Sequence, residues 1–238
     1  MESWLQVGEV RLEAYFQRYR LEGDETSFVG ELLTKPEGHD SPQSYFSQLS
    51  IADQFEILEW HLQLSAQMAE DLRAKISINV HNSLVEHETD RQRFLRILET
   101  TSVPVTLEFT EDYPMPAMES SNRFLRELRE RGHLSALDDY GTGHNGMTLL
   151  TDYDFDVVKI DRSLLANLLT SSERQRSIKL LAQLLDVLGK QHVVEGIDDE
   201  SVHRYLVDAG FTTFQGFLFH RPEPVEQLLA KASMGVER

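Results

Sequence analysis

The 238-residue chain contains no cysteine, which excludes disulfides and thiolate metal sites. No apolar run approaches the roughly 20 residues that a membrane-spanning helix needs. The first residues, Met1 to Trp4, lack the basic region and apolar core of a signal peptide. These absences lead us to expect a soluble, cytoplasmic protein that has no membrane partner.

Basic residues are also scarce, because 23 lysines and arginines stand against 40 acidic residues and give a formal charge of -17. Proteins that bind nucleic-acid polymers need a basic surface to displace counterions, so no such partner is expected. A small phosphorylated ligand is compatible with this charge, since divalent metal ions can carry phosphates into an acidic cleft.

What the sequence does contain is a regular alternation of strand and helix patterns. A first strand is expected at residues 10–19, and the short polar turn after it leads into a strand at 27–33, which suits an antiparallel hairpin. The alternation predicts a single α/β domain over residues 1–238, a TIM-like (β/α)8 barrel with an antiparallel first strand. The other expected strands are 75–80, 105–110, 133–138, 155–160, 191–195 and 211–215. The expected helices are 51–74, 90–100, 116–131, 145–150, 199–209 and 225–232, with further helices between residues 162 and 190.

Polar residues stand at or near the ends of most of these strands. In the strand at 105–110, Val105, Leu107 and Phe109 share one face, and Glu108 points the other way. If the apolar faces meet the helices, the polar residues point into the mouth of the barrel, where barrel enzymes keep their active sites. One such residue alone would more often begin a solvated loop, but the whole set favours a functional site. Its members are Glu31, Asn79, Glu108, Asp138, Lys159, Glu195 and Gln215.

Two adjacent carboxylates, Asp138 and Asp139, stand where the strand at 133–138 ends, before a Gly-Thr-Gly turn. An isolated Asp-Asp pair is more often a solvated helix cap, yet two like charges are costly unless a cation or an array of donors lies between them. Carboxylate and amide oxygens suit Mg²⁺ or Mn²⁺. Lys159 could stabilise a developing oxyanion or hold a metal-bound hydroxide. Two ions that share a carboxylate would form a clamp for attack on a phosphodiester.

These residues resemble, in order, the motifs of the EAL family of cyclic di-GMP phosphodiesterases over about residues 16–224. Glu31-Leu32-Leu33 resembles the Glu-Ala-Leu signature, and Asp138 to Gly143 resembles the Asp-Asp-Phe-Gly-Thr-Gly loop. The remaining similar segments are Gln17, Ile78–Val80, Leu107–Glu111, Lys159–Asp161, Glu195–Ile197 and Gln215–Phe217.

The resemblance implies that the protein hydrolyses cyclic di-GMP to the linear dinucleotide pGpG with Mg²⁺ or Mn²⁺, using two ions, and so lowers this second messenger in bacterial signalling. Glu31, Asn79, Glu108 and Asp138 would hold one ion, and Asp138 would bridge to a second site that includes Asp139.

The resemblance also implies roles around the metal ligands. Lys159 would contact the nucleophilic water, Glu195 would act as general base or orient that water, and Glu111 would brace the Asp-Asp loop. A homodimer is implied as well, with the loop through His144 and Asn145 communicating with the partner subunit. The implied substrate contacts are Gln17, Leu33, Lys35, Asp161 and Gln215.

The chain departs from the family pattern beside the signature. Leu32 replaces an alanine, Lys35 an arginine and Pro36 a tryptophan. Lysine neutralises a phosphate but cannot form the bidentate fork of arginine. A second hypothesis therefore stands beside the enzyme: a non-catalytic domain that acts as a cyclic di-GMP receptor or binds another protein. A third, another metal-dependent barrel hydrolase, would differ in its substrate alone.

Overall fold

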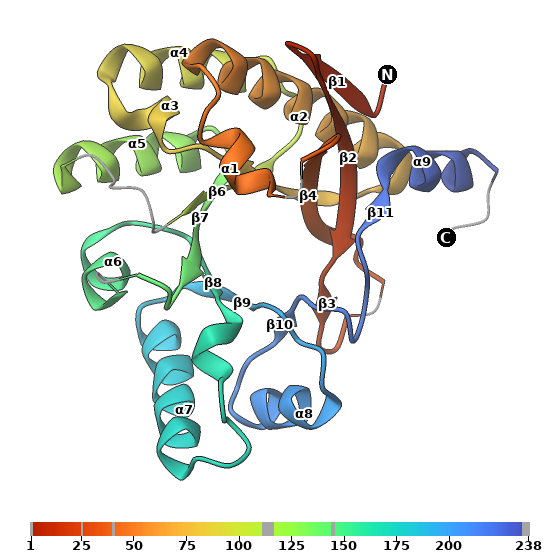
Figure 1. The fold of residues 1–238 in the computed structure, drawn as a ribbon. Coiled ribbons are helices and arrows are strands. Elements are labelled where there is room, and N and C mark those ends of the chain that lie inside the picture. The colour runs from red at the N-terminus through yellow and green to blue at the C-terminus, as the bar shows by residue number, and fades with distance from the viewer. Residues whose placement is uncertain (1, 25, 40, 111–116, 144–145, 235–238) are drawn as a thin grey trace. The chain divides into compact units, whose positions relative to one another are not determined.

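The computed structural model describes residues 2–24, 26–39, 41–110, 117–143 and 146–234. The chain divides into two compact units (Figure 1). Unit 1 comprises Met1–Arg18, Phe28–Leu107 and Pro222–Arg238, and unit 2 comprises Tyr19–Ser27 and Glu108–Arg221. No helix in the described ranges has both the length and the apolar character that crossing a membrane requires.

Unit 1 is built around an antiparallel strand pair. β2 (Val10–Arg18) pairs antiparallel with β4 (Val29–Pro36), and β4 pairs in parallel with β5 (Lys75–Val80). The antiparallel first strand predicted from the short turn is therefore confirmed. Two short strands, β1 (Trp4–Val7) and β11 (Glu223–Pro224), also pair with β2 and were not predicted, because so few residues show no clear alternation.

The main helix of unit 1 is α2 (Ile51–Leu72), which packs on β5 and on α9 (Val225–Ser233). Ser50 and Asp53 form a capping box at its start, and Arg73 ends it in a left-handed conformation with φ of 56°. The predicted apolar positions of α2 are buried, namely Phe55, Leu58, Leu62, Leu64 and Met68. The other helices of this unit are α1 (Pro42–Phe46), α3 (Ser83–Glu86) and α4 (Glu88–Leu98).

One histidine of α2 is buried in the core of unit 1. His61 is 3% exposed, and its Nε2 lies 2.6 Å from Thr34 Oγ1. Burial lowers the pKa of His61 from 6.5 to about 4, since the charged imidazolium loses its hydration. Between these two pH values the unfolded chain therefore binds more protons than the folded chain. The neutral state of His61 costs no free energy of unfolding above pH 6.5, and the protein loses free energy of unfolding through this group as the pH falls toward 4.

We expect His61→Gln to flatten this pH dependence. Between pH 6.5 and 4 the wild type should lose more unfolding free energy than the variant, by about 3 kcal/mol. Urea unfolding at a series of pH values measures the difference. His87→Gln, at an exposed histidine, is the control and should keep the wild-type slope. A variant slope equal to that of the wild type would contradict the assignment.

Gly30 lets β2 and β4 approach closely in unit 1. A Cβ atom added at this position would lie 2.2 Å from the carbonyl oxygen of Gln17 and 2.8 Å from Arg18 Cα. Both contacts are with backbone, which cannot move aside without shifting the strand. The small residue before Glu31 is therefore required by packing.

We expect Gly30→Ala to lower the free energy of unfolding by about 2 kcal/mol, because overpacking forces a backbone shift. Gly189→Ala is the control: its Cβ would meet nothing within 4 Å, although its φ of +66° carries a smaller strain. Urea unfolding of both variants tests the contact, and a loss at Gly30 no greater than at Gly189 would argue against it.

Unit 2 holds a run of parallel strands. β7 (Leu134–Tyr140), β8 (Val157–Ile160), β9 (Gln191–Val194) and β10 (Thr213–Phe214) pair in that order, and β3 (Arg20–Leu21) pairs antiparallel with β10. β6 (Val105–Thr110) carries the chain from unit 1 into unit 2. The helical elements are α5 (Met118–Glu130), α6 (Gly146–Asp152), the 3-10 helix η1 (Arg162–Leu165), α7 (Ser172–Val187) and α8 (Glu200–Asp208).

Several predicted boundaries were wrong by a few residues. β4 continues to Pro36, beyond the predicted end at residue 33, so Lys35 and Pro36 belong to the strand. β7 continues to Tyr140, beyond the predicted end at Asp138, because a bulge extends its pairing. β10 is shorter than predicted, and Gln215 follows it directly. The helices predicted between residues 162 and 190 are present as η1 and α7.

Candidate active site

Lys159 lies at the centre of the candidate site in unit 2. Its side chain, on β8, is 2% exposed. The ammonium Nζ lies 2.7 Å from Glu108 Oε2, 2.9 Å from Asp138 Oδ1 and 2.8 Å from Glu195 Oε1. A buried ammonium is tolerated only with such partners, since desolvation of an isolated charge is costly. Lys159 therefore draws carboxylates from β6, β7 and the end of β9 to one point.

Parallel pairing explains why these side chains meet. In the register of β8 and β9, Lys159 stands opposite Val193. The amide N–H of Glu195 donates to the carbonyl of Ile160 at 3.0 Å, which extends the pairing one residue past the end of β9. Glu195 is therefore held at the carboxyl end of β9, beside the end of β8. The sequence analysis predicted that polar residues at the strand ends would lie together in this way.

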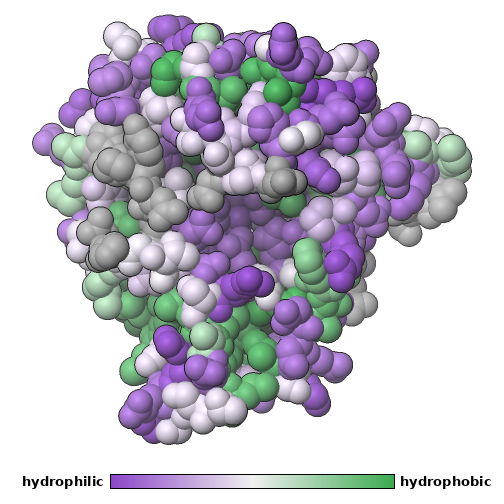
Figure 2. All heavy atoms as spheres, viewed as in Figure 1, coloured by the Kyte–Doolittle hydropathy of each residue, from purple (hydrophilic) through white to green (hydrophobic). Residues whose placement is uncertain are grey.

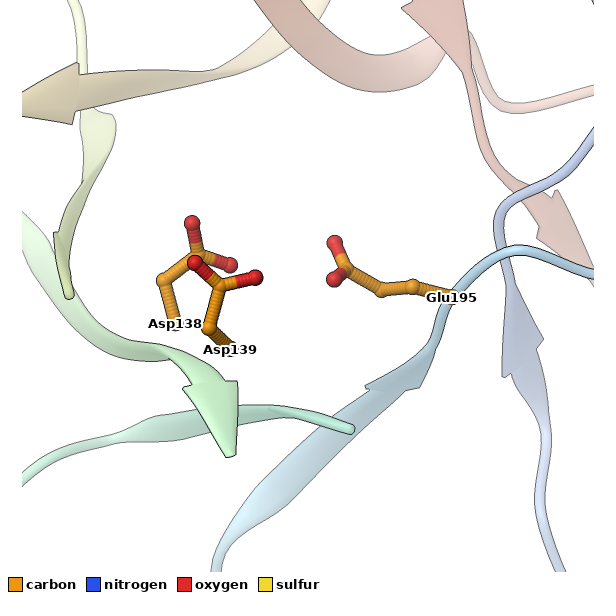
Figure 3. Close-up of side chains that lie close together, drawn as sticks. All are labelled: Asp138, Asp139 and Glu195. Atoms are coloured by element: carbon orange, nitrogen blue, oxygen red, sulfur yellow. The ribbon is translucent and has the colours of Figure 1, made fainter. Parts of the chain in front are cut away.

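A backbone irregularity turns two neighbouring carboxylates to the same side. Successive residues of a regular strand point to opposite faces, which would separate Asp138 from Asp139. Asp139 instead has a φ of 56°, and the register of β7 with β8 shifts between Leu137 and Tyr140. Figure 3 shows the result: both aspartate carboxylates lie side by side, and Glu195 points toward them.

These three carboxylates form a possible metal site. One oxygen from each of Asp138, Asp139 and Glu195 lies within 4.8 Å of the others. Hard divalent cations accept such oxygens, and Mg²⁺ and Mn²⁺ need no nitrogen or sulfur ligand. With Glu108 included, the carboxylates around Lys159 outnumber its single positive charge. The donor set therefore fits a divalent ion, and it places Glu195, which was predicted to act as general base or to orient the water, among the candidate ligands.

Glu108 has a second partner that the sequence analysis missed. The hydroxyl of Tyr19 donates to Glu108 Oε1 at 3.1 Å, while Lys159 donates to Glu108 Oε2. Tyr19 is 8% exposed and Glu108 1% exposed. A signal was present, because Tyr19 stands two residues after Gln17 and shares its side of the chain by alternation.

Gln215 is fixed beside Glu195 by backbone contacts. Its amide N–H donates to Val194 at 2.8 Å, and its carbonyl accepts from Ile197 at 3.0 Å. The next residue must be small, since a Cβ on Gly216 would lie 2.0 Å from the carbonyl oxygen of Ile197. Gln215, 6% exposed, is thereby held next to the predicted base.

Unit 1 brings another predicted group together. Asn79 Nδ2 donates to Glu31 Oε1 at 2.6 Å, and Gln17 stands directly opposite Glu31 in the register of β2 and β4. Leu32 is 0% exposed and, by alternation, faces away from Glu31 into the core. The bulkier residue in the signature is therefore accommodated by packing, away from the carboxylate.

The remaining predicted residues have different settings. By alternation Leu33 and Lys35 lie on the Glu31 side of β4, and Lys35 is exposed. Asp161 caps η1, since its side chain accepts from the amide of Ser163 at 2.8 Å. Its role as a substrate contact stays a prediction. Glu111, His144 and Asn145 lie outside the described residues.

Comparison with known proteins identifies relatives of this chain. The model of the EAL domain family matches residues 45–222, more than half of the chain. The match includes the motifs around Lys159 but begins after Glu31, so the assignment of the signature strand rests on the sequence resemblance and on the geometry of unit 1.

Curated relatives include two proteins of Pseudomonas aeruginosa. The cyclic di-GMP phosphodiesterase RocR is 29% identical over 157 residues, which cover 65% of this chain and 40% of RocR. The bifunctional diguanylate cyclase/cyclic di-GMP phosphodiesterase MucR is 27% identical over 175 residues, which cover 74% of this chain and 24% of MucR. The chain spans less than half the length of either relative.

Solved structures show the fold. An EAL domain protein from Listeria monocytogenes EGD-e aligns with a TM-score of 0.80 at 22% identity, covering 94% of this chain and 93% of that one. BlrP1 of Klebsiella pneumoniae, in a manganese/cy-diGMP complex, aligns with a TM-score of 0.75 at 24% identity, covering 89% and 56%. The predicted fold class, an α/β TIM-like barrel with an antiparallel first strand, is confirmed.

Proposed function

The chain belongs to the EAL domain family, and we propose that it is a metal-dependent phosphodiesterase that hydrolyses cyclic di-GMP to linear pGpG. The observation that carries this proposal is the group around Lys159, where a buried ammonium and acidic oxygens from separate strands meet. Relatives named as cyclic di-GMP phosphodiesterases support the substrate.

We propose Mg²⁺ or Mn²⁺ as cofactor, with two ions bound. The excess of carboxylates over the single ammonium supports this number, because divalent cations would offset the surplus negative charge. Bound ions would supply Lewis-acid activation of water and neutralise phosphate charge. The proposed ligands of unit 2 are Glu108, which contacts Lys159, and the adjacent Asp138 and Asp139. Those of unit 1 are Glu31 and Asn79.

The chain's own residues would divide the chemistry among them. Glu195 would accept the proton of the attacking water, since its carboxylate faces the two aspartates. Lys159 would hold that carboxylate in place and stabilise negative charge as the water oxygen bonds to phosphorus and the bond to the ribose 3′ oxygen breaks. Gln215, anchored beside Glu195, would orient the substrate or the base.

Further proposals concern substrate and surroundings. Gln17, Leu33, Lys35 and Asp161 would contact cyclic di-GMP, with Lys35 neutralising a phosphate. We propose a cytoplasmic protein that lowers this messenger in bacterial signalling and has neither a nucleic-acid polymer nor a membrane as partner. The charge of -17 supports the exclusion of nucleic acid.

A homodimer is proposed on the resemblance and on the surface of unit 2. Met147 on α6 is 59% exposed, and Leu180 and Val187 on α7 are 63% and 81% exposed. Figure 2 shows hydrophobic residues gathering over α7 and the segment before it. Exposed apolar groups of this kind often mark an interface between proteins.

The alternative is a receptor that binds cyclic di-GMP without hydrolysing it, and the replacement of arginine by Lys35 is the observation in its favour. Chromatography of purified protein with cyclic di-GMP, with Mn²⁺ and with excess chelator, separates the two. Linear dinucleotide that forms only with metal supports the enzyme. Calorimetric binding at micromolar concentration without turnover would support the receptor.

A further inference from the structure

We propose that Tyr19 is a positioning residue that orients Glu108 for metal binding. The inference rests on the proposed function, because it assigns Glu108 to a divalent ion. Tyr19 follows β2 directly. It belongs neither to the sequence motifs nor to the cluster of Asp138, Asp139 and Glu195.

The two oxygens of Glu108 are held by different donors. Tyr19 donates to Oε1 at 3.1 Å and Lys159 donates to Oε2 at 2.7 Å. All three side chains are buried, with exposures of 8%, 2% and 1% for Tyr19, Lys159 and Glu108. Water therefore competes little for these bonds, and the carboxylate plane is fixed from both sides.

The segment that carries Tyr19 is itself anchored in unit 2. The next residue, Arg20, pairs with Phe214 of β10. The amide of Glu22 donates to the carbonyl of Thr212 at 2.9 Å. His203 Nε2 lies 3.0 Å from Glu22 Oε1, which ties the segment to α8 as well. The phenol thus approaches Glu108 from a defined direction.

A fixed carboxylate is a better metal ligand than a rotating one. Tyr19 and Lys159 each hold one oxygen of Glu108. A cation can therefore bind this carboxylate without the entropy cost of ordering the side chain. Partners that orient ligands in this way typically change metal affinity by about 10- to 100-fold.

Tyr19→Phe tests the inference, because it removes the hydroxyl and keeps the ring. Mn²⁺ is titrated into the metal-free protein, and the free ion is followed by electron paramagnetic resonance. We expect the dissociation constant to rise by about tenfold. Tyr205→Phe is the matched control: its hydroxyl donates to the carbonyl of Gln175 at 3.0 Å, between α8 and α7, and its loss should leave Mn²⁺ affinity unchanged.

A double-mutant cycle with Glu108→Gln separates positioning from a general structural role. If Tyr19 acts through Glu108, Tyr19→Phe should add no further loss of Mn²⁺ affinity in the Glu108→Gln background. The same additional loss in both backgrounds, or wild-type affinity in Tyr19→Phe, would overturn the inference.

The outcome for the proposed function is read separately. A wild-type protein that binds Mn²⁺ but leaves cyclic di-GMP intact would contradict the proposed phosphodiesterase activity. The double-mutant cycle would still decide whether Tyr19 positions Glu108. A wild type that binds no Mn²⁺ would reject the metal assignment and the inference together.

Discussion

Lys159→Met is expected to lower the turnover of cyclic di-GMP by about 10²- to 10³-fold, because it removes the group proposed to stabilise charge on the reacting phosphate. The metal-free variant should also lose about 3–5 kcal/mol of unfolding free energy, since Glu108 would be left buried without its ammonium partner. Mn²⁺ affinity should rise, because removing the repulsion between the ammonium and the ion outweighs the loss of one donor that orients Glu108.

Loss of Lys159 should lower turnover and raise Mn²⁺ affinity, whereas loss of a metal ligand would lower both. Steady-state rates, urea unfolding and Mn²⁺ titration of one preparation provide the three readings. Lys190→Met is the control, because Lys190 also lies partly buried in unit 2 but donates to the carbonyls of Tyr153 and Phe155. It should lose stability and keep the wild-type metal affinity. Wild-type turnover in Lys159→Met would contradict the proposed role.

Glu195→Gln is expected to lower the catalytic rate by about 10²- to 10⁴-fold, because the amide cannot accept the proton of the attacking water. The fold should be retained, since glutamine has nearly the same shape and the side chain of Glu195 is 17% exposed. Chromatographic rates at saturating cyclic di-GMP and Mn²⁺ measure the loss, and circular dichroism checks the fold.

A neighbouring acidic residue provides the control for this substitution. Glu200→Gln changes the same group in the first turn of α8, where the residue is exposed. It should leave the rate unchanged. A Glu195→Gln rate near that of the wild type would show that another group accepts the proton.

Much of the site was predictable because parallel strands end at one edge and side chains alternate. Glu108 between Leu107 and Phe109, and Lys159 between Val158 and Ile160, stand out as polar residues in apolar strands. The structure shows these two side chains in contact at 2.7 Å. The alternation in each strand predicts this contact correctly because burial of the apolar face restricts each strand to one register.

The remaining features depend on tertiary structure that a local pattern does not specify. The left-handed backbone of Asp139 turns a second carboxylate toward the site. In a regular strand the side chain of Asp139 would point to the face opposite that of Asp138. Tyr19 reaches Glu108 across 89 positions of sequence. β3 and β11 have two residues each, and they form only because partner strands are already in place. Short pairings of this kind carry no signal of their own.

The most direct test of the central claim is hydrolysis in water labelled with ¹⁸O. Purified protein is incubated with cyclic di-GMP and Mn²⁺, and the product is analysed by mass spectrometry, with excess chelator as the control. The account predicts linear pGpG that carries one ¹⁸O atom in its new terminal phosphate, formed only when metal is present. Intact cyclic di-GMP after prolonged incubation, or the same product in chelator, would contradict it.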